Sequence, residues 1–324
     1  MMSLYSPICA LVVGMLGLIW GADRFVAGSA SLAKSLGISS LVVGLTIVSV
    51  GTSAPEIIVS INAALKGSSQ LAVGNALGSN LANIGLVLGV TLLISSIPVQ
   101  KNLLKQEGLI LLLVTVVAGI CLYNGFLGRL ESLLLIALVI PLLFFAAKYK
   151  KPQVDTANPQ TTDSLHKKGA LLSFVIGLFV LLISSELTVW GAKSIALELG
   201  ISELVIGLTI VAIGTSLPEL AASAMSAIRG HHDIAIGNII GSNLFNLLLV
   251  MGVAGAISPV ALDSMVFSRD YIAMAIMTAM LLLFIGLALG KISDRAMLPK
   301  KVGIVLITAY CLYYLVLWSS ITTH

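Results

Sequence analysis

The chain has 324 residues, of which 58% are hydrophobic and only 10% are charged. Soluble domains hold about a quarter of their residues as Asp, Glu, Lys and Arg, so this composition excludes an ordinary water-soluble domain. The formal net charge is +4, but the basic residues are spread over short polar stretches, which argues against a nucleic-acid partner. The composition therefore predicts a protein whose solvent is the lipid bilayer.

Apolar stretches divide the chain into ten segments, each long enough to cross a membrane. A helix needs roughly 20 residues to cross about 30 Å of hydrocarbon. The segments lie near residues 5–27, 38–66, 70–97, 105–125, 129–147, 169–192, 202–229, 233–258, 269–290 and 301–320. The fold class that this predicts is an all-α polytopic membrane protein with ten transmembrane helices.

One long polar interruption, residues 148–168, predicts a solvated linker. It separates an N-terminal five-helix half, residues 1–147, from a C-terminal five-helix half, residues 169–324. The linker is short, and we identify no soluble regulatory domain. This organisation suits a multi-pass protein of a bacterial or archaeal inner (plasma) membrane.

The second and seventh segments carry the same motif. Residues 41–56 read LVVGLTIVSVGTSAPE, and residues 204–219 read LVIGLTIVAIGTSLPE. The offset between Glu56 and Glu219 is 163 residues, and it also places GNALGSNLAN of the third segment on GNIIGSNLFN of the eighth. This internal duplication covers most of the chain, and its period is far too long for a solenoid repeat.

Basic residues in the loops predict the orientation. The connections that would lie on one side of the membrane hold fourteen Lys and Arg residues, and those on the other side hold four. The positive-inside rule then places the central linker in the cytoplasm and both termini outside. Because each half has an odd number of spans, the two halves have inverted topology. Secondary transporters are commonly built this way, with the substrate near the membrane midplane.

Glu56 and Glu219 each follow a proline in the middle of an apolar segment. An ionised carboxylate there costs roughly 2.5–3.5 kcal/mol on insertion scales, so each one requires compensation. The proline has no N–H, and its ring displaces the carbonyl four residues back, which belongs to Gly51 in one copy and Gly214 in the other. We expect a kinked or broken helix with free carbonyls beside each carboxylate.

Hydroxyl and amide side chains accompany the two carboxylates. Thr-Ser pairs precede each proline, and the third and eighth segments each carry a Ser and an Asn spaced i, i+4 on one helix face. Such hard oxygen ligands suit Ca²⁺, Na⁺, Mg²⁺ or Mn²⁺ better than zinc or copper. Two negative charges neutralise one divalent or two monovalent ions. The candidate ligands are Glu56, Glu219, Thr52, Thr215, Ser53, Ser216, Ser79, Ser242, Asn83 and Asn246.

Two other classes of membrane protein could also use these polar residues, an intramembrane hydrolase and a cation channel. An intramembrane hydrolase would need a base near the motif serines, but all four histidines fall in loops or at the terminus, so we expect no enzyme and no covalent cofactor. A cation channel would usually gain its ring of oxygens from subunit symmetry, whereas this chain contains an inverted pair within itself. Asp23 and Glu186 lie toward the ends of their spans and are weaker candidates, for which the open alternative is a snorkelling or gate-lining role.

The paired motifs GTSAPE with GTSLPE, and GNALGSNLAN with GNIIGSNLFN, resemble the α-repeats of the calcium/cation antiporter superfamily, most closely those of prokaryotic Na⁺/Ca²⁺ exchangers. The resemblance implies four ion sites at the membrane midplane, with the first and sixth helices sliding to alternate access. It implies that Glu56 and Glu219 are Ca²⁺ ligands shared with Na⁺, helped by Thr52 and Thr215. The residues implied to complete the Na⁺ sites are Ser53, Ser79, Ser216, Ser242 and Asn83.

One position departs from part of that superfamily. Several members, including the potassium-dependent branch, carry Asp where this chain has Asn246, and the GNxxE pattern of the proton-coupled branch is missing here. We therefore expect an antiporter that exports Ca²⁺ from the cytoplasm in exchange for Na⁺. Its expected partners are Ca²⁺, Na⁺ and the lipid bilayer, and no obligate protein partner is implied. The alternatives are an H⁺- or K⁺-coupled divalent cation antiporter and a cation channel.

Overall fold

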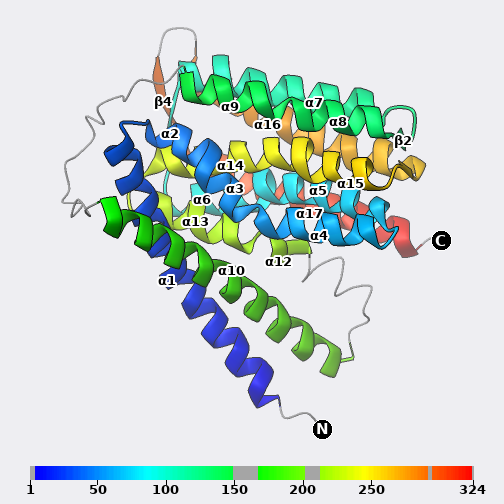
Figure 1. Ribbon diagram of the computed structural model, residues 1–324, viewed down its shortest axis with the longest axis horizontal. Coiled ribbons are helices and arrows are strands. Elements are labelled where there is room, and N and C mark those ends of the chain that lie inside the picture. The colour runs from blue at the N-terminus through cyan, green and yellow to red at the C-terminus, as the bar shows by residue number, and fades with distance from the viewer. Residues whose placement is uncertain (1–3, 149–166, 201–211, 291–293, 323–324) are drawn as a thin grey trace. The chain divides into compact units, whose positions relative to one another are not determined.

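The computed structural model describes residues 4–148, 167–200, 212–290 and 294–322 (Figure 1). Nearly all of its elements are helical, and η marks the π-helical turns. The first half contains α1 (Tyr5–Leu36), α2 (Ser40–Val43), η1 (Gly44–Val48), α3 (Ser49–Thr52), α4 (Ala54–Leu65), α5 (Ser69–Ala82), η2 (Asn83–Leu88), α6 (Gly89–Ile94), β1 (Ile97–Gln100), η3 (Leu103–Gly108), α7 (Leu109–Leu122), β2 (Phe126–Leu127), α8 (Arg129–Ala137) and α9 (Val139–Lys148). The second half contains α10 (Lys167–Glu198), α12 (Ala212–Thr215), α13 (Leu217–Ile228), α14 (His232–Phe245), η5 (Asn246–Val250), α15 (Met251–Ile257), β3 (Val260–Ala261), η6 (Val266–Tyr271), α16 (Ile272–Leu289), β4 (Arg295–Leu298) and α17 (Lys300–Thr322).

The helical membrane fold is confirmed. Within the described ranges, seven helices are long and apolar enough to cross a bilayer, and an eighth span results if the bent pair Ser40–Thr52 and Ala54–Leu65 is counted as one. Shorter helices occupy the fifth and seventh predicted segments, so the ten-helix count is consistent with the structure. Most of the linker 148–168, and residues 201–211 of the seventh segment, lie outside the described residues.

The first and sixth helices are longer than the sequence predicts. Both have 32 residues, and they continue past the predicted ends at residues 27 and 192. Each is followed closely by a glycine with positive φ, 65° at Gly37 and 76° at Gly200, a conformation that stops a helix at little cost for glycine. Asp23 and Glu186, which lie toward the ends of the predicted spans, are inside these helices and do not interrupt them.

The duplication in the sequence is also a duplication of local structure. The helices α3, α4 and α5 recur as α12, α13 and α14 with every boundary displaced by the same 163 residues. The π-helical turns η2 and η3 begin at residues 83 and 103, and η5 and η6 begin at residues 246 and 266, again at this offset. The two halves therefore specify the same irregular helices, including their defects.

Contacts divide the chain into two compact units, and each unit combines segments from both halves of the sequence. The first unit comprises Met1–Pro55 and Leu143–Asn238, and the second comprises Glu56–Leu142 and Ile239–His324. The division into sequential five-helix halves therefore describes the repeat, while the compact units mix the repeats. The units are described separately below.

In the first unit, α1 and α10 lie side by side and antiparallel (Figure 1). Glycines allow their backbones to approach closely. A Cβ atom added at Gly21 would lie 2.7 Å from the backbone nitrogen of Leu181, and one added at Gly191 would lie 2.7 Å from the carbonyl oxygen of Pro7. Small residues at such positions are typical of helix pairs in membranes. Large apolar side chains on other faces of the pair, including Leu16 and Phe179, are exposed, as expected for helices that contact lipid.

In the second unit, two short antiparallel strand pairs reproduce the repeat. Ile97 of β1 lies opposite Leu298 of β4, and Val260 of β3 lies opposite Leu127 of β2. Because Val260 is the repeat equivalent of Ile97, the two pairings occupy equivalent places in the two halves. Gly85 and Gly89 pack closely against α17, where they approach Tyr310 and Ile307.

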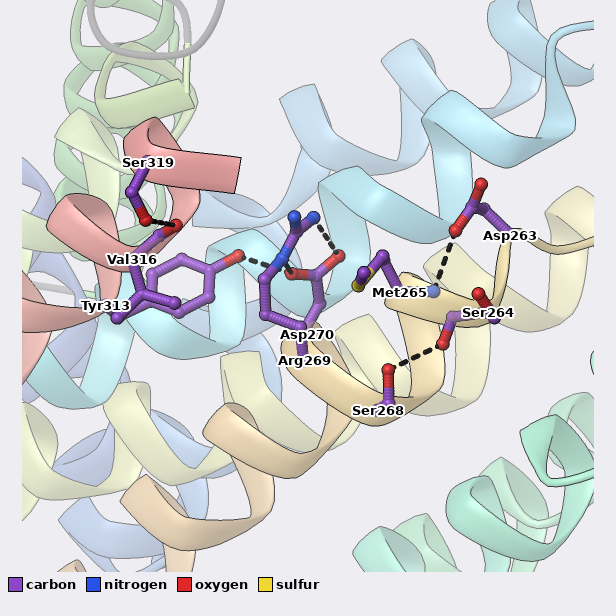
Figure 2. Close-up of polar contacts among 9 residues, drawn as sticks. All are labelled: Asp263, Ser264, Met265, Ser268, Arg269, Asp270, Tyr313, Val316 and Ser319. Atoms are coloured by element: carbon purple, nitrogen blue, oxygen red, sulfur yellow. Dashed lines mark hydrogen bonds and ion pairs between the residues drawn. The ribbon is translucent and has the colours of Figure 1, made fainter. Parts of the chain in front are cut away.

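A polar cluster joins η6 to α17 in the second unit, as Figure 2 shows. The Arg269 guanidinium donates to both carboxylate oxygens of Asp270, at 2.7 and 3.2 Å. The Tyr313 hydroxyl donates to the same carboxylate at 3.0 Å (Figure 2). Arg269 lies inside the π-helical turn η6, where it forms an ion pair with its neighbour.

Candidate ion-binding site

Each copy of the GTSxPE motif contains the helix break predicted from its proline. The backbone leaves helical geometry at Ser53 with φ −82° and ψ 7°, and at Ser216 with φ −88° and ψ 5°. In the first copy, the helical segments on either side meet at 45°. The breaks lie two residues before Pro55 and Pro218, not at the glycines, because a proline disfavours helical geometry in the residues before it as well as removing an N–H.

The two copies differ in what binds the displaced carbonyl. The Gly214 carbonyl accepts a hydrogen bond from the Ser185 hydroxyl of α10 at 3.1 Å. At the repeat position of Ser185 the first half has Ala22, which has no hydroxyl to donate. The carbonyl of the second copy is therefore partnered within the protein, whereas the sequence suggested that it was available to an ion.

Glu219 lies in the first unit and is only 1% exposed. The hydroxyl of Ser53, which is completely buried, donates to its Oε1 atom at 2.9 Å. Ser53 belongs to the first copy of the motif and Glu219 to the second, so this hydrogen bond joins the two repeats. A hydroxyl that donates its proton to a carboxylate keeps two lone pairs that can bind a cation.

Asn238 links a second pair of polar groups in the first unit. Its Oδ1 atom accepts a hydrogen bond from the Thr52 hydroxyl at 3.1 Å, and its Nδ2 atom donates to the Ser223 hydroxyl at 3.0 Å. All three side chains are completely buried. The sequence identified Asn238 as part of the repeat but gave it no role, and Ser223 was not identified at all. Ser223 lies four residues after Glu219, on the same face of α13.

Glycines bring η1 and α14 close enough for the contact between Thr52 and Asn238. A Cβ atom at Gly44 would lie 2.7 Å from the carbonyl oxygen of Ile234, and one at Gly237 would lie 2.7 Å from that of Leu41. Any larger residue would separate these helices. Gly44 and Gly237 thus let the helix that carries Thr52 and the helix that carries Asn238 approach each other closely.

Glu56 lies in the second unit and is also 1% exposed. The Asn75 side chain donates to the Glu56 backbone carbonyl at 3.4 Å, which ties the start of α4 to α5. The Ser and Asn candidates on α5, η2, α14 and η5 are all buried, with exposed fractions of 2% or less. These residues are Ser79, Asn83, Ser242 and Asn246.

Asn83 and Asn246 are the first residues of the π-helical turns η2 and η5. Among the described residues, the Nδ2 and Oδ1 atoms of Asn83 have no hydrogen-bond partner. The Oδ1 atom of Asn246 has none either. Buried amides are normally hydrogen-bonded, and π-helical turns often occur at functional sites. Both residues therefore carry a buried amide oxygen that a cation could bind.

A further asparagine pair joins the two repeats in the second unit. The Asn80 side chain donates to the backbone carbonyl of Asn243 at 3.2 Å, and the two residues are equivalent in the repeat. The helices α5 and α14 therefore meet at corresponding positions. This contact positions Asn83 and Asn246 one turn further along adjacent helices.

Of the ten candidates, the first unit brings together Thr52, Ser53 and Glu219. Thr215 and Ser216 lie at the break between α12 and α13 in the same unit, and the Ser216 hydroxyl has no hydrogen-bond partner among the described residues. The donors are carboxylate, hydroxyl and amide oxygens, which is the set preferred by Ca²⁺ and Na⁺.

The two peripheral acids have different surroundings. Asp23 forms an ion pair with Arg229, which follows α13, and the Nε atom of Arg229 lies 2.7 Å from Oδ1 of Asp23. Glu186 is exposed. The ion pair links the middle of α1 to the end of the helix that carries Glu219.

The chain is similar to known membrane proteins over most of its length. The chain is 33% identical over 352 residues to the sodium/calcium exchanger MaX1 of Methanosarcina acetivorans, covering 95% of this chain and 97% of that protein. It is 40% identical over 280 residues to the inner membrane protein YrbG of Escherichia coli (strain K12), covering 83% and 85%. A structure of the sodium-calcium exchanger NCX_Mj, soaked with zero Na⁺ and Ca²⁺, is similar with a TM-score of 0.84 at 32% identity, covering 97% of this chain and 99% of that one.

The family model described as sodium/calcium exchanger protein matches residues 6–148 and 169–319, which is almost the whole chain. The matched ranges include both copies of the motif and every candidate ligand. The chain belongs to the sodium/calcium exchanger protein family.

Proposed function

We propose that this protein is a secondary active antiporter that exports cytoplasmic Ca²⁺ in exchange for external Na⁺. Membership of the sodium/calcium exchanger family supports cation antiport. The observation that carries the proposal furthest is the hydrogen bond from Ser53 to Glu219, because it joins the two motif copies at a buried carboxylate. A carboxylate held in this way inside a membrane protein marks an ion pathway.

The ligands divide according to the charge that each ion requires. Ca²⁺ takes the carboxylates of Glu56 and Glu219 with oxygens of Thr52 and Thr215, because a divalent ion needs two negative charges once it is dehydrated. Na⁺ uses the same carboxylates and the same Thr52 and Thr215 oxygens. Neutral hydroxyl and amide oxygens complete its sites, and they are supplied by Ser53, Ser216, Ser79, Ser242, Asn83 and Asn246. Since both ions require Glu56 and Glu219, Na⁺ binding expels Ca²⁺ and Ca²⁺ binding expels Na⁺.

Alternating access is assigned to α1 and α10. Their glycine-lined contact, with backbone atoms close together, supports movement of the two helices as one body. The movement changes which side of the membrane can reach the ligands when they are filled. The loop charges support an orientation with the central linker in the cytoplasm and both termini outside, in the inner (plasma) membrane.

Na⁺ is the coupling ion that the ligand set favours. Asn246 supplies a neutral oxygen at the start of η5, so the site has no third carboxylate there to take up a proton or to balance a K⁺ ion. H⁺- or K⁺-coupled exchange of a divalent cation is the alternative. It predicts Ca²⁺ movement driven by those gradients in the absence of Na⁺.

The test is Na⁺-driven uptake of radioactive Ca²⁺ into everted membrane vesicles. Glu56→Gln and Glu219→Gln each remove one negative charge while preserving shape, so we expect uptake to be lost at unchanged expression. Glu198→Gln is the matched control, because Glu198 is exposed at the end of α10, and it should transport normally. Normal uptake by either motif variant would overturn the assignment of the shared carboxylates.

A further inference from the structure

The contacts of Asn238 form part of a closed series of polar interactions in the first unit. Ser53 donates to Glu219, Thr52 donates to Asn238, and Asn238 donates to Ser223, which is on the same helix as Glu219. The series begins and ends on α13 and passes through the Thr-Ser pair of the first repeat. Every member is buried, with an exposed fraction of 1% or less.

We propose that Asn238 is a positioning residue for Na⁺ binding, acting through the hydroxyl of Thr52; this rests on the proposed function. A threonine hydroxyl has one proton and two lone pairs. The Oδ1 atom of Asn238 accepts that proton at 3.1 Å, with the Ser49 carbonyl further away at 3.4 Å. The proton is thereby directed to the protein, and the lone pairs of Thr52 are left for a cation.

The orientation of the Asn238 amide decides whether this works. If the amide were turned around, its NH₂ group would face Thr52 and would donate to one of the lone pairs that a cation needs. In the structure the amide has the favourable orientation, because Nδ2 donates to the Ser223 hydroxyl at 3.0 Å and Oδ1 accepts from Thr52. Ser223 thus accepts from the amide, the amide accepts the Thr52 proton, and the Thr52 hydroxyl presents oxygen lone pairs to the ion.

The repeat equivalent of Asn238 makes a different contact. In the second unit, Asn75 donates to the backbone carbonyl of Glu56 at 3.4 Å. The hydroxyl of Ser60, which is the repeat equivalent of Ser223, is buried and has no hydrogen-bond partner among the described residues. The full series of side-chain contacts runs through Asn238, so Asn238 is the position to test.

A double-mutant cycle separates positioning from simple packing. The variants are Asn238→Ala, Thr52→Val and the double variant. The measured quantity is the Na⁺ constant, which is the Na⁺ concentration that gives a half-maximal response. Loss of one buried hydrogen bond corresponds to an effect of about tenfold. We expect each single variant to require about tenfold more Na⁺, and the double variant to require no more than the worse single variant. Independent effects, which would multiply to about a hundredfold, would overturn the proposal.

Two measurements keep this test distinct from the test of function. The Na⁺ constant is taken both from Na⁺ activation of Ca²⁺ exchange and from the Na⁺-dependent rise in melting temperature of the purified protein. A wild-type protein that is stabilised by Na⁺ but performs no exchange would contradict the proposed function. The double-mutant cycle could still be completed from the melting temperatures. An Asn238→Ala variant with the wild-type Na⁺ constant would remove the positioning role.

Controls and a milder variant complete the experiment. Asn102→Ala alters an exposed asparagine whose side chain caps no helix, and Thr91→Val removes a buried hydroxyl that donates to the Val87 carbonyl, so both should keep the wild-type Na⁺ constant. If Asn238→Ala fails to fold, Ser223→Ala still releases the amide. It is expected to raise the Na⁺ requirement a few-fold, and a wild-type Na⁺ constant in this variant would contradict the proposal.

Discussion

Replacing Ser53 by alanine tests the contact that joins the two repeats. The substitution removes a hydroxyl that donates to the buried Glu219 carboxylate at 2.9 Å. Hydrogen bonds to charged groups contribute about 1.5–3 kcal/mol, which corresponds to a factor of roughly 10 to 150 in an equilibrium constant. The same hydroxyl is a proposed Na⁺ ligand. We therefore expect Ser53→Ala to weaken apparent Na⁺ binding at least tenfold.

The response to Ca²⁺ should differ in direction. Without the Ser53 hydroxyl, the ion-free carboxylate loses a stabilising partner, and a bound divalent ion compensates for that loss directly. Ca²⁺ should consequently bind with unchanged or tighter affinity, and it should restore the melting temperature that the ion-free variant loses. The assay is the pair of apparent constants for Na⁺ and Ca²⁺ in reconstituted vesicles, together with melting curves in detergent.

Ser29→Ala is the matched control for this prediction. Ser29 is also completely buried in the first unit, but its hydroxyl donates to the Phe25 carbonyl within α1. Its replacement should leave the ratio of the two constants unchanged. Equal weakening of Na⁺ and Ca²⁺ by Ser53→Ala, or no change in either, would refute the reasoning.

Three further changes probe the packing, the polar cluster and the coupling ion. Gly21→Ala places a Cβ atom 2.7 Å from a backbone nitrogen of α10. Overpacking should cost about 1–3 kcal/mol and outweigh the roughly 1 kcal/mol gained in helix propensity, so the melting temperature should fall. An unchanged or higher melting temperature would count against close backbone packing. Tyr313→Phe removes the 3.0 Å hydrogen bond to Asp270 and should cost about 1–2 kcal/mol of stability without altering the Na⁺/Ca²⁺ ratio, and an altered ratio would argue for a role in ion binding. Asn246→Asp adds a carboxylate at the start of η5 and should make transport sensitive to pH or K⁺; an unchanged profile would contradict the role given to this amide.

The local irregularities of the fold could be predicted because their causes are local. A proline without an N–H predicts a break in each copy of the motif, and the structure has one at Ser53 and one at Ser216. The repeat predicts that whatever happens in one half recurs in the other, and the helix boundaries follow it. The i, i+4 spacing likewise placed Ser79 and Asn83 on one face.

Partners that are distant in the sequence could not be predicted in the same way. Asn238 was visible as a repeated residue, but its bond to Thr52 depends on the close approach of two helices through Gly44 and Gly237. The bond from Ser185 to the Gly214 carbonyl depends on the packing of α10. Nothing in the local pattern of a helix states which side chain of another helix will face it.

The lengths of α1 and α10 were underestimated for a related reason. Charged residues such as Asp23 and Lys34 suggested the end of a span, because charges are costly in lipid. In the structure Asp23 forms an ion pair with Arg229, so it remains within the helix. Hydrophobicity alone therefore locates the apolar part of a helix but not the point at which the helix ends.

The most direct test of the central claim is counterflow with purified protein in sealed vesicles. Vesicles loaded with Na⁺ and diluted into Na⁺-free medium containing radioactive Ca²⁺ should accumulate Ca²⁺, and equal gradients of K⁺ or H⁺ should not drive accumulation. Protein carrying Glu219→Gln should accumulate none. Accumulation driven by K⁺ or H⁺ without Na⁺, or Ca²⁺ entry that is indifferent to every imposed gradient, would contradict the account.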